Sequence, residues 1–238
     1  VDREIPNDSK LIRRTFTRLK AEAEQLRCCY EAGPCGFELY RLLTAMGIPC
    51  EVVAPALIPQ KPGERIKTDR RDARKLVRLY RAGELTSIRV PTPEEEAVRD
   101  LVRAREDVRR DLTAARHRLS KFLLRHGRRF SQGKNWTERF WSWLRTQTFE
   151  RPAEQVTFEH YVLQVHHLEE RRAALEREIA DVAETAPYRP AVARLACLRG
   201  ISTLSAMTLL AEIQDFRRFE HPRPLMAFLG LVPSEHSS

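Results

Sequence analysis

Two long stretches of the 238-residue chain carry mostly apolar residues at alternating spacings of three and four. The first covers residues 98–122 and the second residues 158–182. A repeat of about 3.5 residues places one apolar seam along a helix, and such seams pack against each other. We therefore predict two long paired helices, forming either a hairpin within the chain or an interface between subunits. Each seam contains one arginine, Arg105 or Arg172, which we expect to fix the register by disfavouring slipped pairings.

The segment between these helices, residues 127–150, is rich in aromatic side chains and arginine. Its rings include Trp136, Phe140, Trp141 and Trp143. They fit either a packed hairpin tip or a platform on which nucleic-acid bases stack. Of the two, we favour the packed tip.

Strand and helix patterns alternate in the amino-terminal part of the chain. Short apolar segments at residues 25–30 and 50–54 predict strands, because turn residues follow each of them. The spacing of apolar residues predicts helices over residues 37–46 and 68–81. A strand, helix, strand, helix order at this spacing implies crossover connections and a parallel or mixed sheet.

These patterns predict an α/β plus α fold in three sections. Residues 1–92 form the α/β section, residues 93–186 the long-helix section and residues 187–238 a small helical section. In the last section, Gly200 precedes a predicted helix over residues 202–213. This resembles a helix-hairpin-helix turn, in which backbone amides approach a phosphate. A plain packing corner between helices explains the pattern equally well.

Positive charge is concentrated in one part of the chain. The net charge is +9, and residues 99–145 hold 14 basic and 5 acidic residues, so the rest of the chain balances to zero. Such a segment is typical of proteins that bind a polyanion, although a solvated arginine-rich helix face is the alternative. The candidate nucleic-acid-binding residues are Arg109, Arg110, Arg116, Arg118, Lys121, Arg125, Arg128, Arg129, Lys134 and Gly200. No run of about 18 uncharged apolar residues occurs, which excludes a membrane-spanning helix.

Three acidic residues are candidates for a metal site. Glu31 follows the first predicted strand, and Asp69 and Asp72 share one face near the start of a predicted helix. Carboxylates that converge at a strand end suit Mg²⁺, and two such ions can clamp a phosphodiester. The alternative is that the aspartates cap the helix and Glu31 is a surface residue. From the residues alone, we favour this alternative.

The other reactive side chains point less clearly to chemistry. The five cysteines are an odd number without framework spacing, which favours reduced thiols in the cytosol. Cys28 and Cys29 are adjacent on a strand and point to opposite faces, so they do not easily share a zinc ion. The serines at positions 234, 237 and 238 are typical of a loop. The phosphate-binding motif of nucleotide-driven motors and the nucleophile elbow of α/β-hydrolases are both missing from the sequence.

Several motifs together resemble DEDD-type insertion-sequence transposases, the class that includes Piv DNA invertases and bridge-RNA-guided recombinases. The motifs occur in the family's order over nearly the whole chain, which reverses our interpretation of the acids. They are Tyr30-Glu31-Ala32-Gly33-Pro34, Lys67-Thr68-Asp69-Arg70-Arg71-Asp72-Ala73, Arg199-Gly200-Ile201, Ala211-Glu212-Ile213-Gln214-Asp215-Phe216-Arg217-Arg218-Phe219 and Leu229-Gly230-Leu231-Val232-Pro233-Ser234-Glu235-His236-Ser237-Ser238.

The resemblance implies a partial RNase H-type, RuvC-like domain, a coiled-coil segment and a small helical domain that carries a serine. The family's second, third and fourth acids fall on Glu31, Asp69 and Asp72, and its first aspartate would lie before the sequence given. The family serine falls on Ser238, with Ser237 as second choice. The implied reaction is DNA strand exchange. Mg²⁺ held by the acids polarises the scissile phosphate, and the serine attacks phosphorus to give a covalent protein–DNA intermediate.

The family also implies partners and a location. These are DNA, a structured guide RNA in some members, and a dimer or tetramer joined through the coiled coil, in the bacterial cytoplasm near the nucleoid. We expect the sequence to be a fragment cut at both ends and inactive alone. Robust Mg²⁺-dependent recombination by these 238 residues would refute that. Two alternative functions are a non-catalytic coiled-coil protein that binds nucleic acid, and an RNase H-type nuclease that needs the acids but no serine.

Overall fold

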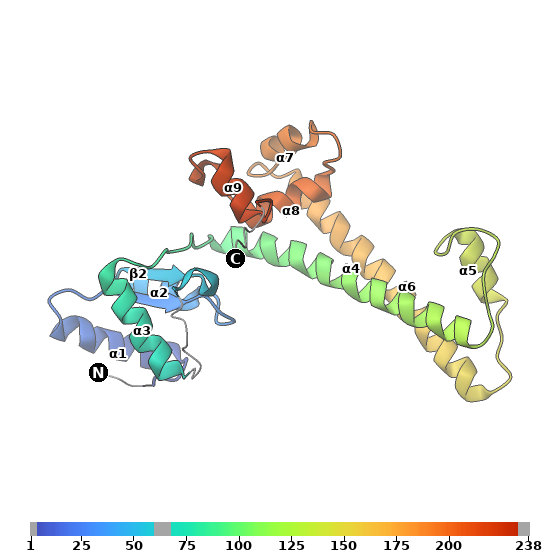
Figure 1. Cartoon of the computed structure of the whole chain (residues 1–238), viewed down its shortest axis with the longest axis horizontal. Coiled ribbons are helices and arrows are strands. Elements are labelled where there is room, and N and C mark those ends of the chain that lie inside the picture. Colours follow the sequence, from blue (N-terminus) through green and yellow to red (C-terminus); the bar gives the residue numbers. More distant parts are fainter. Residues whose placement is uncertain (1–3, 60–67, 233–238) are drawn as a thin grey trace, which may run out of the picture. The chain divides into compact units, whose positions relative to one another are not determined.

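The computed structural model describes residues 4–59 and 68–232. The chain divides into two compact units, Val1–Val90 and Pro91–Ser238. Helices dominate the described residues, and one small parallel sheet lies in the first unit (Figure 1). The expected class of α/β followed by α is therefore confirmed.

The first unit is built around two parallel strands. Strands β1 (Cys28–Glu31) and β2 (Cys50–Val53) pair with Cys28 opposite Cys50 and Glu31 opposite Val53. The connection between them contains α2 (Glu38–Ala45), as the crossover prediction required. The other elements of this unit are α1 (Ser9–Glu22), the 3-10 turn η1 (Pro55–Leu57) and α3 (Asp69–Ala82).

Local sequence explains where α3 begins and ends. The side chain of Thr68 accepts a hydrogen bond from the Arg71 backbone N–H at 3.4 Å, which satisfies a donor that the first turn leaves free. The helix ends at Gly83, whose φ of +71° is a left-handed conformation that favours glycine. The helix predicted over residues 68–81 is thus confirmed within one residue at each end.

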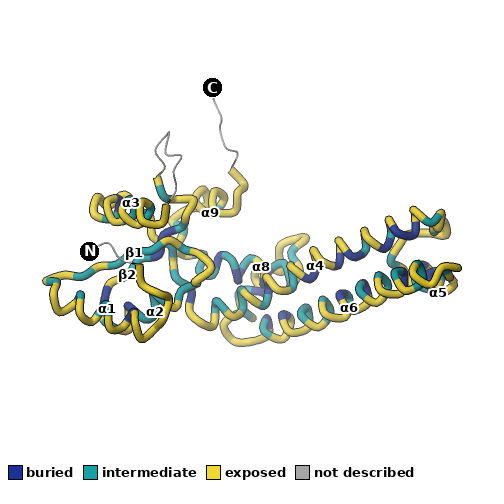
Figure 2. The backbone as a smooth tube through the Cα atoms, turned by 90° about the horizontal axis from the view of Figure 1, so that it is seen from below, coloured by how far each residue is buried: buried dark blue, intermediate teal, exposed yellow. Residues whose placement is uncertain are grey.

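The two predicted long helices pair within the chain. Helix α4 (Pro93–Arg125) and helix α6 (Pro152–Ala183) lie side by side as a hairpin (Figure 1). Figure 2 shows buried residues recurring along both helices, and the seams supply most of them. The buried seam residues are Val108, Leu112, Ala115, Leu119, Phe122, Phe158, Val165, Leu168 and Ile179. The sequence leaves open whether the seams pair within the chain or between subunits, and the structure pairs them within the chain.

The arginines of the two seams meet at one glutamate. Arg105 Nε donates to Glu176 Oε1 at 2.9 Å, and Arg172 Nε lies 3.7 Å from the same oxygen. The Arg105 side chain is only 18% exposed. A shifted register would leave this partly buried charge without its partner, which agrees with the role expected for Arg105.

The aromatic segment forms a small core at the tip of the hairpin. Helix α5 (Glu138–Arg145) buries Phe140 and Leu144 against α4 and α6. Phe140 contacts Phe130, Trp136 and Trp143, with ring centroids 4.9–5.7 Å apart. The predicted packed tip is confirmed.

Three further helices and one 3-10 turn follow the hairpin in the described part of the chain. These are α7 (Arg189–Ala196), α8 (Thr203–Ile213), the 3-10 turn η2 (Phe216–Arg218) and α9 (Pro222–Phe228). Helix α8 packs on the other end of the hairpin and shares a core with α4 and α6 through Ala206 and Met207, which are fully buried. Arg103 of α4 holds the end of α8 with two 2.8 Å hydrogen bonds to Glu212. Among the described helices, none is long and apolar enough to cross a membrane.

Candidate active site and nucleic-acid surface

The three candidate acids line one groove of the first unit. Glu31 comes from the end of β1, and Asp69 and Asp72 come from the first turn of α3. The groove has a volume of about 390 Å³. Thirty-seven residues separate Glu31 from Asp69 in the sequence, so only the fold brings these acids to one groove. The three acids named by the family resemblance thus line the same groove, and their role as metal ligands stays a prediction.

Contacts between α3 and the sheet set the position of the two aspartates. The Tyr80 hydroxyl donates to Glu51 Oε1 of β2 at 3.0 Å, and Leu79 is 9% exposed. These contacts fasten the second half of α3 and leave its acidic first turn at the groove. Negative side chains are also favourable in a helix's first turn, because the helix dipole is positive there.

The remaining side chains of the groove are uncharged at neutral pH. Burial raises the pKa of the Cys29 thiol, and nearby Glu51 raises it further. Burial is also the main reason that the pKa of Tyr30 rises to about 12. Of the residues that line the groove, the three carboxylates are therefore its charged groups.

The donor chemistry of the groove suits Mg²⁺, but the ligands are not assembled. Magnesium prefers carboxylate oxygens and keeps several waters, so a few carboxylates are enough to hold it. In residues 4–59 and 68–232, no group of three or more His, Cys, Asp and Glu side chains is close enough to hold one ion. Glu31 and Asp69 are exposed and Asp72 is half-buried. Binding would thus require these side chains to change rotamer.

All five cysteines are free thiols. Cys28 and Cys50 are register partners on β1 and β2. Burial raises their pKa values to about 11 and about 12, and neighbouring groups add to the effect: Cys29 for Cys28, and Cys28, Cys29 and Glu51 for Cys50. They are neutral at physiological pH, as expected for small half-buried groups.

The predicted nucleic-acid-binding residues of the hairpin fall into two groups, according to whether their side chains have polar partners among the described residues. In the first group the charge is used within the protein. Arg116 is 25% exposed, pairs with Glu169 and lies 4.9 Å over the Trp136 ring. Its guanidinium therefore already has a carboxylate and a ring as partners within the protein, and its role as a phosphate ligand stays a prediction. Others also bond within the chain: Arg109 and Arg110 to acidic side chains of α4, and Arg128 to Thr148 O.

In the second group the charge faces solvent. Arg118, Lys121 and Arg125 are exposed and follow each other at spacings of three and four on α4, which places them on one face. Arg129 and Lys134 are exposed beyond the end of that helix. These five residues remain available for a phosphate backbone.

The last predicted positions lie near the carboxyl end. Gly200 has a φ of +90° and is followed by Ser202, whose side chain caps α8 by accepting from the Ser205 N–H at 3.2 Å. A turn before a helix start is present there, and whether it approaches a phosphate stays a prediction. Ser237 and Ser238 lie outside the described residues.

Sequence reasoning did not single out Tyr80 and Glu51, which position the acidic turn of α3, or Glu169, which takes up the charge of Arg116. Glu51 offered a signal, because it is a charged residue within an otherwise apolar strand. Glu169 offered none, since its partner is 53 residues away.

Comparison with known proteins gives consistent matches. A DEDD-type IS110 family profile, described as a transposase, matches residues 1–127, and a profile of the transposase IS116/IS110/IS902 family matches residues 192–238. The y4qE protein of Sinorhizobium fredii, which carries a transposase name, is 44% identical over 227 residues, covering 95% of this chain and 55% of its own length. The transposase for insertion sequence element IS1533 of Leptospira borgpetersenii is 39% identical over 224 residues, covering 93% of this chain and 65% of its own length. The chain thus spans less than two thirds of the length of either relative.

Proposed function

The chain belongs to the DEDD-type IS110 family of transposases, and we propose that it carries the metal-binding acids and a nucleic-acid-binding hairpin of such an enzyme. One observation supports the proposal above all others. Glu31, Asp69 and Asp72, which match the family's acids, line a single groove although they come from two distant segments.

The proposed reaction is Mg²⁺-dependent DNA strand exchange. The three carboxylates would hold the ion, and the open side of the groove would admit a DNA phosphate. Bound Mg²⁺ supplies Lewis-acid polarisation of that phosphate. The nucleophile would be the hydroxyl of Ser238, or of Ser237. The serine oxygen would lose its proton and form a bond to phosphorus while the bond from phosphorus to the leaving DNA oxygen breaks. That oxygen would take up a proton, and the protein would hold the other DNA end covalently.

We propose that the first unit is part of an RNase H-type, RuvC-like domain. The parallel pair of β1 and β2 with its crossover helix supports this, as does the acid at the end of β1. In parallel α/β sheets, ligands bind beyond the carboxyl ends of the strands. Glu31 is at such an end.

The hairpin would bind the phosphate backbone of DNA or of a structured guide RNA through five exposed basic residues. These are Arg118, Lys121, Arg125, Arg129 and Lys134. It would also join subunits into a dimer or tetramer. Exposed apolar side chains on α6, Val156 at 65% and Leu163 at 67%, support a further contact on this helix. The site of action would be the bacterial cytoplasm.

The metal-binding part of the proposal can be tested on the 238-residue chain itself. We expect calorimetric titration with Mg²⁺ and Mn²⁺ to detect binding, and Glu31→Gln or Asp72→Asn to weaken it about tenfold or more, because each removes one charged ligand. Glu24→Gln is the matched control, an exposed acid of the same unit outside the groove, and should bind as the unchanged chain does. Failure of the unchanged chain to bind either ion, or equal binding by all variants, would contradict the proposal.

A metal-dependent nuclease would use the same groove without a serine. In a full-length relative, Ser238→Ala at the matching position separates the two functions. Loss of covalent DNA attachment together with loss of strand exchange supports the recombinase. Cleavage that persists without attachment supports the nuclease.

A further inference from the structure

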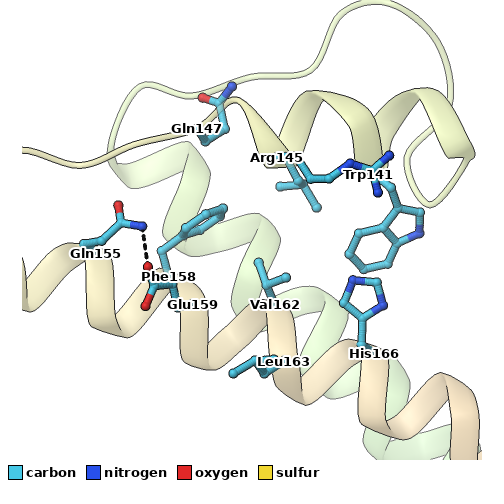
Figure 3. A pocket seen from close by; sticks show the side chains of 10 residues that line it. Trp141, Arg145, Gln147, Gln155, Phe158, Glu159, Val162, Leu163 and His166 are labelled. Atoms are coloured by element: carbon cyan, nitrogen blue, oxygen red, sulfur yellow. Dashed lines mark hydrogen bonds between the residues drawn. The ribbon is translucent and has the colours of Figure 1, made fainter.

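A second groove lies at the tip of the hairpin, between α5 and α6, far along the chain from the acidic groove (Figure 3). Its volume of about 440 Å³ falls within the range of pockets that hold small molecules or single bases. Apolar side chains form most of its wall, including Leu144, Phe158 and Val162. The proposed strand-exchange chemistry gives this groove no role.

A flat aromatic pair closes one end of the groove. The Trp141 ring of α5 stacks on the His166 ring of α6, with centroids 4.1 Å apart and an interplanar angle of 27°. Figure 3 shows both rings beside the groove, with Phe158 toward the opposite end. Ring faces and apolar walls of this kind bind the flat surface of a nucleic-acid base.

A single carboxylate is held in the groove by a short hydrogen-bond chain. Gln155 Nε2 donates to Glu159 Oε1 at 2.7 Å, while Gln155 Oε1 accepts from the Phe149 backbone N–H at 2.9 Å. The amide of Gln155 is therefore fixed at both ends and holds Glu159 in turn. Of the described residues, only Gln155 donates to this carboxylate, so both Oε1 and Oε2 of Glu159 still have a free lone pair and can each accept a further donor.

The surroundings of the groove are strongly basic. Residues 125–145 contain six Lys and Arg residues and one acidic residue, Glu138. Arg145, which lines the groove, pairs with the exposed Glu138 at 3.1 Å, and its own side chain is 66% exposed, so part of the guanidinium still faces solvent. A polyanion is therefore attracted to the tip as a whole, although the groove itself holds one negative group.

We propose that this groove binds one unpaired guanine of a single-stranded segment of nucleic acid, a proposal that rests on the nucleic-acid-binding function inferred above. Guanine is the base whose pairing edge carries two adjacent donors, N1–H and N2–H, and a carboxylate accepts both. Adenine and cytosine place an acceptor beside their amino group, which a carboxylate repels. Uracil and thymine offer one donor between two acceptors. The base stacks against the aromatic and apolar wall, Glu159 accepts from its edge, and Arg145 lies close to the phosphate.

The test is fluorescence anisotropy with labelled single-stranded decamers of adenine that carry one central guanine, inosine or adenine, in a DNA series and an RNA series. We expect the guanine decamer to bind the chain about tenfold more tightly than the all-adenine one, and inosine, which lacks the N2 amino group, to fall between them. The series with the larger preference identifies the natural source of the base.

Two pairs of variants locate the binding site. Glu159→Gln should remove the guanine preference, whereas Glu170→Gln, an exposed acid of the same helix, should keep it. His166→Ala should weaken binding of every single strand about tenfold, whereas His167→Ala, whose side chain is exposed, should not. Circular dichroism establishes that the variants are folded.

A preference below twofold, or one that survives Glu159→Gln, would overturn the guanine site. Duplex DNA measured in parallel separates this failure from that of the proposed function. Retained, salt-sensitive duplex binding without guanine preference refutes the groove alone. Absence of binding to every nucleic acid refutes both.

Discussion

In the unit Val1–Val90 two acids of the candidate site lie at the surface, whereas in the unit Pro91–Ser238 several charged side chains pair with each other between the long helices. Glu31 and Asp69 are exposed and line an open groove. Arg105 and Arg116, by contrast, are partly buried and pair across the hairpin with Glu176 and Glu169. Charge that is left to solvent is available to an ion or a phosphate, and charge that is paired in a core fixes a register.

The two units also differ in how they are packed. The first unit buries Ile12, Leu43, Ile48, Val52, Val53 and Leu79, which come from short elements. The second has a continuous seam along two helices of 33 and 32 residues, extended at both ends by further helices. The hairpin is therefore the more stable part of the molecule. The acidic groove belongs to a smaller core, and rearranging that core around a ligand costs less free energy because fewer buried contacts are broken.

The largest expected effect comes from breaking the seam. Leu119 is fully buried, so Leu119→Ala should lower the free energy of unfolding of the helical unit by about 3–5 kcal/mol. All three tryptophans lie between residues 136 and 143, and tryptophan fluorescence during urea unfolding therefore reports this unit alone. Leu163→Ala, at a position 67% exposed, is the control and should cost less than about 0.5 kcal/mol. A comparable loss in both variants would mean that the seam is not the main source of stability.

The reactivity of Cys28 tests how well the small core of the first unit shields its side chains. At pH 8, Cys28 should react with iodoacetamide about a hundredfold more slowly than an ordinary thiol, because its pKa is raised from 9.0 to about 11 and little thiolate is present. Mass spectrometry of the labelled peptides gives the rates, with the exposed Cys35 as an internal reference. Equal rates would show that the sheet does not shield Cys28.

The same pKa shift links stability to pH. The folded state holds the Cys28 proton at pH values where the unfolded chain releases it. The contribution of this thiol to stability is thus fully present below about pH 9 and is lost as the pH rises toward about 11. Denaturation of the first unit should become easier across that window.

A smaller effect is expected from the charged position of the seam. Arg105→Ala leaves the partly buried Glu176 without its main partner, and we expect a loss of about 2 kcal/mol in the helical unit. The matched control is Arg110→Ala, whose side chain is 68% exposed and whose ion pairs should contribute little. Urea unfolding at low salt compares the two, and an equal, small loss would remove the proposed register role.

The smallest effect concerns the exposed basic face. Arg118→Ala should weaken duplex DNA binding by a few-fold and reduce the slope of log affinity against log salt by about one, since one phosphate contact is lost. Arg177→Ala removes an exposed arginine outside the basic segment and should leave the slope unchanged. Equal slopes for both variants would place the DNA elsewhere on the chain.

The long helices were predictable because their pattern is local and repeated over many turns. A seam of apolar residues from 98 to 122 specifies both the helix and its buried face. The seam does not by itself distinguish a partner helix in the same chain from one in another subunit. The segment at the tip decides that in favour of a hairpin, because Phe140 of α5 is buried in one core with residues of both long helices.

That the three acids share one groove was predictable only from the family resemblance. Local sequence reasoning favours two helix-capping aspartates and an unrelated surface glutamate instead. The pair Asp69 and Asp72 reads as ordinary helix-start chemistry, and they do lie in the first turn after the Thr68 cap. What places them beside Glu31 is the docking of Tyr80 on Glu51, a contact over 29 residues that no local pattern specifies. Similarly, no spacing rule reveals that Arg116 pairs with Glu169, which is 53 residues away.

We expect one divalent ion to contact the end of β1 and the start of α3 at the same time. Loading the chain with Fe²⁺ in place of Mg²⁺ and adding ascorbate and peroxide produces hydroxyl radicals that cut the backbone close to the ion, and mass spectrometry locates the cuts. We expect cuts near Glu31 and near Asp69 to Asp72 in the same sample. Excess Mg²⁺ and the substitution Glu31→Gln should each suppress both sets of cuts. Cuts at only one of the two segments, or cuts that persist in Glu31→Gln, would contradict this expectation.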